Sequence, residues 1–127
     1  MYKEIIIITL VIAFIAGLDI ITNSFTIYAG DKLSEELTSL REYILKEDKQ
    51  NIEKNIKEIE NNWDKYNKRL SYYMEHDELE KVGSSLTSLK AYIDMEEYAD
   101  SIEKLDECIF ILQHIEEKEK FSVGSLF

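Results

Sequence analysis

The chain begins with an apolar block and then changes to a regular alternation of apolar and polar positions. Residues 5–18 are apolar except for Thr9 and Gly17. At about 1.5 Å per residue, a helix over this block is roughly 21 Å long, shorter than the roughly 30 Å hydrocarbon core of a bilayer. Extending the helix to Ile21 and beyond supplies the missing length but includes Asp19. An aspartate in mid-membrane costs about 2.5–3.5 kcal/mol, but here it follows the block, where water and headgroups reach it. We therefore expect a membrane-spanning helix.

Two other interpretations of the block are weaker. A cleaved signal peptide would end after Ala29, but bulky Ile27 stands where the cleavage site prefers a small residue. A buried core helix would have a polar face, and the block has none. We favour an uncleaved signal anchor, and secretion after cleavage remains the alternative.

The orientation follows from the short tail and the charges beside the block. Only Lys3 among the basic residues precedes it, whereas Lys32 and Arg41 follow it, and Lys and Arg near a span favour the cytoplasmic side. The tail is nevertheless only a few residues long and a large domain follows. We expect a single-pass protein of the cell membrane with its C-terminal domain extracytoplasmic.

Beyond residue 30, apolar residues recur in steps of three and four, the spacing of one face of an α-helix. Such stripes pack together in helical bundles. Four stripes are visible: Leu33, Leu37, Leu40 and Ile44; Ile52, Ile56, Ile59, Trp63, Tyr66, Leu70 and Tyr73; Leu79, Val82, Leu86, Leu89 and Ile93; and Tyr98, Ile102, Leu105, Ile109 and Leu112.

Candidate N-caps mark where the helices begin, because the first amides of a helix lack internal partners. Asp77 and Asp94 each have a glutamate three residues later, the spacing of a capping box. Asp31 and Asp48 can cap the first two helices of the bundle through their carboxylates alone.

A short repeat relates the two halves of this helical region. Residues 37–44 recur as residues 86–93 with six identities in eight positions, 49 residues apart. An Ile-Glu-Lys match at 52–54 and 102–104 follows at an offset of 50. The repeat predicts two similar helical hairpins, although helices of restricted composition also match by chance.

These patterns predict an all-α fold. We expect an N-terminal membrane helix over residues 1–30, followed by a four-helix antiparallel bundle with a short C-terminal tail over residues 31–127. The absence of Pro, and only two Gly beyond residue 30, favour long helices over sheets or linkers.

The charge of the bundle argues against binding to nucleic acids and to anionic membrane faces. Lys3, Glu4 and Asp19 are the only charged residues among the first 30, so 14 basic and 24 acidic residues lie beyond them, a net charge of −10. Such a surface repels nucleic-acid phosphate and anionic membrane faces.

No catalytic, metal or cofactor motif is present. The single Cys108 excludes an internal disulfide, and its apolar surroundings predict a small core hydrophobe. His76 and His114 lack the Glu three residues earlier that a di-metal carboxylate bundle needs. Nucleotide-binding and serine-hydrolase motifs are also missing. We therefore expect no enzyme activity, no metal and no cofactor.

Aromatic residues are the only candidates for contact with a partner. Tyr43 and Tyr92 occupy equivalent positions of the repeat, while Tyr72 and Tyr73 lie near the end of the second stripe and Phe127 ends the chain. Tyrosine combines a large contact area with a polar tip, which suits a recognition surface. Filling the boundary between core and solvent is the alternative role for these rings.

Several segments together resemble domain of unknown function family 4363. They are Trp63, residues 76–79, residues 86–93, residues 114–115 with the glutamates after them, and residues 125–127. The resemblance implies a small membrane-anchored protein of about 120 residues, of the kind found in spore-forming Firmicutes. It implies no activity, cofactor or catalytic residue.

We therefore expect a membrane-anchored extracytoplasmic bundle that acts as a protein-interaction or accessory module beside an unidentified envelope protein. A sensor that holds a small molecule or ion between the hairpins is the alternative, and an apolar cavity lined by polar groups would favour it. A small hydrolase would require a cleft with convergent titratable residues.

Overall fold

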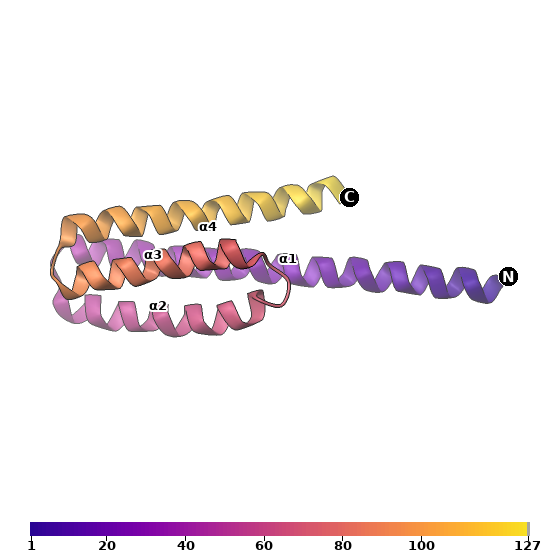
Figure 1. Ribbon diagram of the computed structural model, residues 1–127, viewed down its shortest axis with the longest axis horizontal. Helices are drawn as coiled ribbons and strands as arrows, with labels where there is room; N and C mark the ends of the chain where they lie inside the picture. The colour runs from indigo at the N-terminus through magenta and orange to yellow at the C-terminus, as the bar shows by residue number, and fades with distance from the viewer. Residues whose placement is uncertain (127) are drawn as a thin grey trace.

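A computed structural model describes the backbone of residues 1–126 and the side chains of residues 1–121. Over this range the fold is all-α, as predicted, and consists of four helices. They are α1 (Tyr2–Leu45), α2 (Lys49–Leu70), α3 (His76–Asp94) and α4 (Tyr98–Leu126) (Figure 1).

The predicted membrane helix and the first helix of the bundle form one continuous helix, α1. The expected N-cap at Asp31 is therefore wrong, because no helix begins there. The packed part of α1 includes buried Thr26 and Ala29 as well as Leu33 and Leu37, so packing begins several residues before position 31. The apolar block extends beyond the other helices (Figure 1) and its side chains are exposed, which contradicts a core helix.

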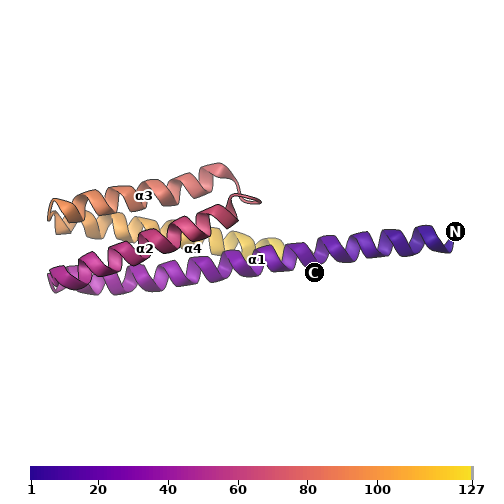
Figure 2. The ribbon, with the colours of Figure 1, turned by 90° about the horizontal axis from the view of Figure 1, so that it is seen from below.

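The helices run alternately up and down around a shared core (Figure 2). Each of α2 and α4 packs beside α1, and α3 packs beside α4, whereas α2 and α3 make the smallest contact of the neighbouring pairs. The α1–α2 and α3–α4 turns lie at one end, here called the distal end. The α2–α3 turn lies at the proximal end, from which the apolar part of α1 emerges (Figure 1).

Three of the four predicted stripes form the core. All members of the first and third stripes are buried, as is the second stripe up to Leu70. Tyr73 lies beyond the end of α2 and is 38% exposed, so its assignment to the second stripe is wrong.

The fourth stripe differs from the prediction. Leu105 and Leu112 are buried as expected, but the other buried positions of α4 are Ser101, Cys108 and Ile115, and the predicted Tyr98, Ile102 and Ile109 lie beside the core. The reason is that the second hairpin buries the same positions as the first, shifted by a fixed number of residues. Buried residues of the two hairpins correspond at a constant offset of 49: Leu33 and Val82, Leu37 and Leu86, Leu40 and Leu89, Ile44 and Ile93, Ile52 and Ser101, Ile56 and Leu105, Ile59 and Cys108, Trp63 and Leu112, and Tyr66 and Ile115.

The turn at the end of each hairpin explains why the offset stays constant. In the first turn, the amide of Glu47 donates to the Ile44 carbonyl oxygen at 3.0 Å. In the second, the amide of Glu96 donates to the Ile93 carbonyl oxygen at 3.0 Å. Both glutamates have positive φ, 54° and 55°. Since the turns are alike and keep the offset at 49, the Ile-Glu-Lys segments 52–54 and 102–104, which are 50 residues apart, do not occupy equivalent positions.

The helix starts agree with the predicted caps only at Asp48. Its carboxylate accepts a hydrogen bond from the Asn51 amide at 3.4 Å, at the start of α2. Asp94 instead ends α3, and Asp77 lies within the first turn of α3, whose N-cap is Glu75. A buried serine at the α4 start is satisfied locally, because the Ser101 hydroxyl donates to the Tyr98 carbonyl oxygen at 2.7 Å.

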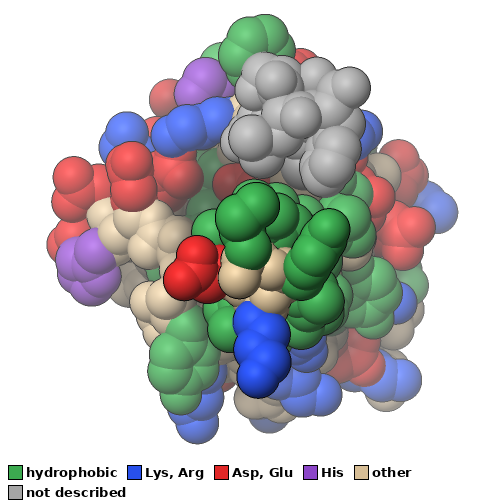
Figure 3. All heavy atoms as spheres, turned by 90° about the vertical axis from the view of Figure 1, so that its right-hand side faces the viewer, with side chains coloured by type: hydrophobic (Ala, Val, Ile, Leu, Met, Phe, Trp, Pro, Cys, Tyr) green, Lys and Arg blue, Asp and Glu red, His purple; other side chains and the backbone are tan. Residues whose placement is uncertain are grey.

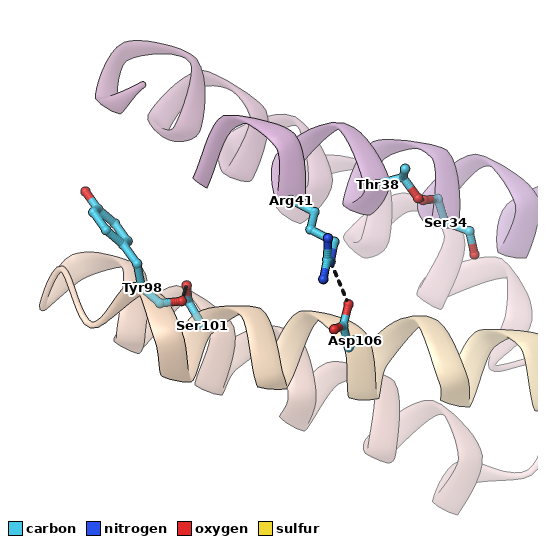
Figure 4. Close-up of polar contacts among 6 residues, drawn as sticks. All are labelled: Ser34, Thr38, Arg41, Tyr98, Ser101 and Asp106. Atoms are coloured by element: carbon cyan, nitrogen blue, oxygen red, sulfur yellow. Dashed lines mark hydrogen bonds and ion pairs between the residues drawn. The ribbon is translucent and has the colours of Figure 1, made fainter. Parts of the chain in front are cut away.

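An ion pair joins α1 and α4 across the surface of the bundle. The Arg41 guanidinium on α1 points toward α4 and donates through Nε to Asp106 Oδ1 at 3.1 Å (Figure 4). Both side chains are exposed to solvent, so the pair adds less than about 1 kcal/mol.

Candidate interaction surfaces

A hollow lies between α2 and α3, which contact each other less than the other neighbouring helices do. It is an open groove of about 770 Å³ and is here called the α2–α3 groove. From α2 and its C-cap it is lined by Glu60, Trp63, Asp64, Asn67 and Ser71, and from α3 by His76, Leu79, Glu80, Gly83, Ser84, Leu86, Thr87 and Lys90. Since α2 and α3 belong to different hairpins, this groove marks the seam between the two halves of the repeat.

Trp63 and Gly83 form the floor of the α2–α3 groove. Trp63 is 8% exposed, and a Cβ at position 83 would lie 3.5 Å from its indole Nε1. The largest side chain of the chain thus faces a position without a side chain. The indole thus lies at contact distance from the α3 backbone at Gly83.

The rim of the groove is acidic. Three carboxylates, those of Glu60, Asp64 and Glu80, line it. Lys90 Nζ lies 3.2 Å from Glu60 Oε1, and His76 Nε2 lies 3.9 Å from Glu80 Oε2. Lys90 neutralises the charge of Glu60 only. The remaining negative charge of the rim favours a ligand that carries basic groups.

A small gap lies in the described part of the core. It has a volume of about 20 Å³ and is lined mostly by apolar side chains near the proximal end. Small-molecule sites typically occupy about 300–1,000 Å³. Cys108 is fully buried in this core, as the sequence predicted, and burial raises the pKa of its thiol to about 12.

An aromatic cluster lies on α1 and α2 near the proximal end. The Phe25 and Tyr28 rings each meet the Tyr66 ring edge-on, with centroids 6.0 and 6.2 Å apart. The Arg69 guanidinium lies over the Phe25 ring, 4.1 Å from its centroid. Burial, and next the nearby Tyr28, raise the pKa of Tyr66 to about 12. Phe25, Tyr28, Tyr66 and Arg69 are called the proximal aromatic cluster.

Two hydrogen-bonded contacts hold the other elements to α1 at this end. The Tyr73 hydroxyl, from the α2–α3 turn, lies 2.9 Å from Thr26 Oγ1 and donates to the Thr22 carbonyl oxygen at 3.0 Å. Asn23 Nδ2 donates to the carbonyl oxygen of Glu119 on α4 at 2.9 Å and to its Oε2 at 3.1 Å.

The predicted contact residues fall at opposite ends of the bundle. Tyr43 and Tyr92 are half-buried near the distal turns, where their carbonyl oxygens accept the amides of the turns. Tyr72 and Tyr73 lie in the proximal α2–α3 turn, with exposed fractions of 89% and 38%. Phe127 lies outside the described residues. These tyrosines therefore do not form one surface.

The α2–α3 groove was not predicted from the sequence, although one signal pointed to it. An isolated Gly within a helical stripe often reflects close packing, and Gly83 is such a residue. Its partner Trp63 lies 20 positions earlier on another helix, so the pairing depends on the tertiary structure. Nothing in the sequence indicated that Arg69 contacts Phe25.

Comparison with known proteins identifies a family but no individual relative. No curated protein and no solved structure matches the chain. The model of the family described as domain of unknown function (DUF4363) matches residues 20–126, which confirms the resemblance. The matched range covers the whole bundle and includes the part of α1 before residue 31 that packs against the other helices.

Proposed function

The chain belongs to the DUF4363 family of domains of unknown function, and from its architecture we propose that it is a membrane-anchored, extracytoplasmic module that binds a protein partner in the cell envelope. The partner contributes an amphipathic helix with basic residues, which docks in the α2–α3 groove. The protein acts by binding and not by catalysis.

The anchor is supported by the continuity of α1. Its N-terminal part is long and apolar enough to span a membrane, and its side chains lie outside the bundle. Cleavage after Ala29 would cut the helix inside its packed part and remove buried Thr26 and Ala29 from the core. An uncleaved span therefore agrees better with the packing than a removed signal peptide.

The helical nature of the partner is supported by the shape of the groove. From Glu60 on α2 to its C-cap Ser71 the lining extends over about 17 Å or three turns of helix. Docking of an amphipathic helix into a groove is a common mode of recognition. Trp63 adds a small apolar area to the floor, and the carboxylates of Asp64 and Glu80, which Lys90 does not pair, favour basic residues on the partner.

The alternative, a small-molecule sensor, is less well supported. It calls for an apolar cavity lined by polar groups, and the described core has a gap of only about 20 Å³. The α2–α3 groove is open along its length, so a small ligand would remain largely in contact with water.

Site-specific photo-crosslinking in native membranes tests the proposed partner. A photoreactive amino acid at Ser84 or Thr87, on the rim of the groove, is expected to crosslink to a helical segment with basic residues, identified by mass spectrometry. Lys65 is exposed on α2 at the height of the groove but does not line it, so it is the matched control and should give no such product. The substitutions Asp64→Lys and Glu80→Lys should abolish the product at Thr87. Equal labelling from Lys65, or a product unaffected by both substitutions, would contradict the groove as the site.

Protease treatment of protoplasts tests the topology. The bundle should be digested from outside, as a known external domain is. Protection of the bundle under the same conditions would exclude the extracytoplasmic orientation.

A further inference from the structure

The bundle begins directly at the end of the predicted span. If Lys3 and Glu4 lie in the inner headgroup layer and the hydrocarbon core begins at Ile5, its roughly 30 Å thickness ends close to residue 24, at about 1.5 Å per residue. Among the described residues, the first hydrogen bonds from α1 to other elements are made by Thr22 and Asn23. No linker separates the bundle from the bilayer.

The contacts of α1 bring two other segments to this depth. Tyr73 bonds to Thr22 at 3.0 Å, which holds the α2–α3 turn at the outer edge of the hydrocarbon core. Asn23 bonds to Glu119 at 2.9 Å, which holds α4 at the same level. Because α4 is antiparallel to α1, Phe121 lies about 3 Å deeper than Glu119. The helix continues to Leu126 and reaches farther along α1 than the α2–α3 turn does (Figures 1 and 2).

The side chains exposed at this level suit the membrane interface. Tyr72 is 89% exposed and Phe121 is 78% exposed, and aromatic rings are enriched where hydrocarbon meets the headgroups. Lys68 and Arg69 form the last turn of α2 beside Tyr72, so basic groups lie where lipid phosphates would be. Figure 3 looks at the molecule from this side, with the apolar N-terminal part of α1 projecting toward the viewer in the centre and charged side chains of the bundle behind and around it.

We propose that the proximal end of the bundle is a lipid-binding surface, which rests in the outer headgroup layer of the bilayer that α1 spans. Tyr72 and Phe121 insert at the edge of the hydrocarbon core, and Lys68 and Arg69 contact lipid phosphates. Tyr72 thus faces lipid and not a protein partner. This inference rests on the proposed function, because it requires that α1 is an uncleaved span. It adds that the bundle has a fixed height and orientation above the membrane, with the α2–α3 groove reaching down to the bilayer surface.

Spin-label accessibility on the full chain tests the proposal. The protein is reconstituted in nanodiscs of phosphatidylcholine and phosphatidylglycerol, in a Cys108→Ala background, and a nitroxide is attached to one introduced cysteine at a time. The labelled positions are 72 and 121 at the proximal end, 12 within the apolar block, and 95 at the distal end. Ile12 and Met95 are both exposed in the isolated chain, 62% and 58%, so exposure alone does not distinguish the controls.

We expect labels at 72 and 121 to be several-fold less accessible to a water-soluble nickel complex than the label at 95, and more accessible to oxygen. The label at 12 should be the deepest. If 72 and 121 behave like 95 while 12 is deep, the anchor stands and the lipid-binding surface is excluded. If 12 is also accessible from water, the proposed anchor itself fails. Circular dichroism of each labelled variant checks that the helices are retained.

Discussion

At the scale of single residues, one partly buried carboxylate opposes folding at neutral pH. Glu36 on α1 accepts a hydrogen bond from Asn62 on α2 through Oε1, while its Oε2 is buried without a partner among the described residues. Desolvation by burial raises the pKa of Glu36 above its ordinary value, and the Asn62 hydrogen bond and the nearby Lys32 only partly offset this.

The raised pKa of Glu36 determines how its contribution to stability changes with pH. Because the folded pKa lies above the unfolded one, the contribution of Glu36 to stability is fully present below the unfolded pKa and is lost as pH rises through the folded pKa. Glu36→Gln should therefore stabilise the protein at pH 7 by less than about 1 kcal/mol, since solvent screens a half-exposed carboxylate. The gain should vanish near pH 4. Denaturant unfolding at both pH values measures it.

A matched substitution distinguishes burial from net charge. Glu53→Gln removes the same charge from an exposed position on α2 and should change the free energy of unfolding little at either pH. If both substitutions stabilise equally, relief of the overall negative charge and not desolvation of Glu36 is the cause.

At the scale of elements, the two hairpin turns carry the same backbone strain. Glu47 and Glu96 have φ of 54° and 55°, a left-handed conformation that a side chain disfavours by about 1–2 kcal/mol and that Gly adopts freely. The residues before them, Lys46 and Met95, have φ of −88° and −87°, which any residue adopts. The strain is thus confined to one position in each turn.

Glycine substitutions test whether the strain lies at these two positions and not at their neighbours. Glu47→Gly and Glu96→Gly should each stabilise the protein by about 0.5–1 kcal/mol, less than the full strain because glycine also gains entropy in the unfolded chain. Thermal unfolding in detergent micelles, followed by circular dichroism, should show a higher midpoint for each. Lys46→Gly and Met95→Gly, one position earlier, should lower it. Destabilisation by all four substitutions would contradict the turn geometry.

The register of α4 illustrates what periodicity alone misses at this scale. Ile102 and Ile109 are the more apolar choice for a core stripe, yet Ser101 and Cys108 are buried in their place. The α3–α4 turn imposes this register, and the Ser101 hydroxyl is satisfied by the Tyr98 carbonyl oxygen. A sequence pattern ranks apolar faces, whereas the turn determines which face meets the core.

At the scale of the whole molecule, the bundle and the anchor share the helix segment 22–30. Thr26 and Ala29 are buried, and Thr22 and Asn23 bond to the α2–α3 turn and to α4. The apolar side chains before this segment are exposed. The bundle should therefore fold without residues 1–21 but not equally well without residues 22–30.

Two fragments test this boundary. Residues 22–127 should be soluble and helical and should unfold cooperatively in urea. Residues 31–127 should be less stable by about 2–4 kcal/mol, since they lose four hydrogen bonds to the α2–α3 turn and α4 and the packing of Thr26, Ala29 and the Phe25 ring. Equal free energies of unfolding would mean that the bundle begins at residue 31.

The candidate sites could be predicted from the sequence less well than the fold. The tyrosines chosen from the repeat, Tyr43 and Tyr92, are equivalent in structure but are partly covered at the distal turns. The α2–α3 groove has Trp63 and Gly83 side by side on its floor, two residues on helices from different hairpins. A stripe predicts that each residue faces a core, but not which neighbour it meets there.

The sequence by itself determined that this protein has an apolar N-terminal helix, three of its four core stripes and two similar hairpins, because helical periodicity and burial follow from local spacing. Only the tertiary structure decided that the apolar N-terminal helix and the first bundle helix are one, because packing around Ala29 overrides the capping signal at Asp31. It also decided the register of α4 and the opening between α2 and α3. These features depend on turn geometry and on contacts between distant residues, which no local pattern encodes.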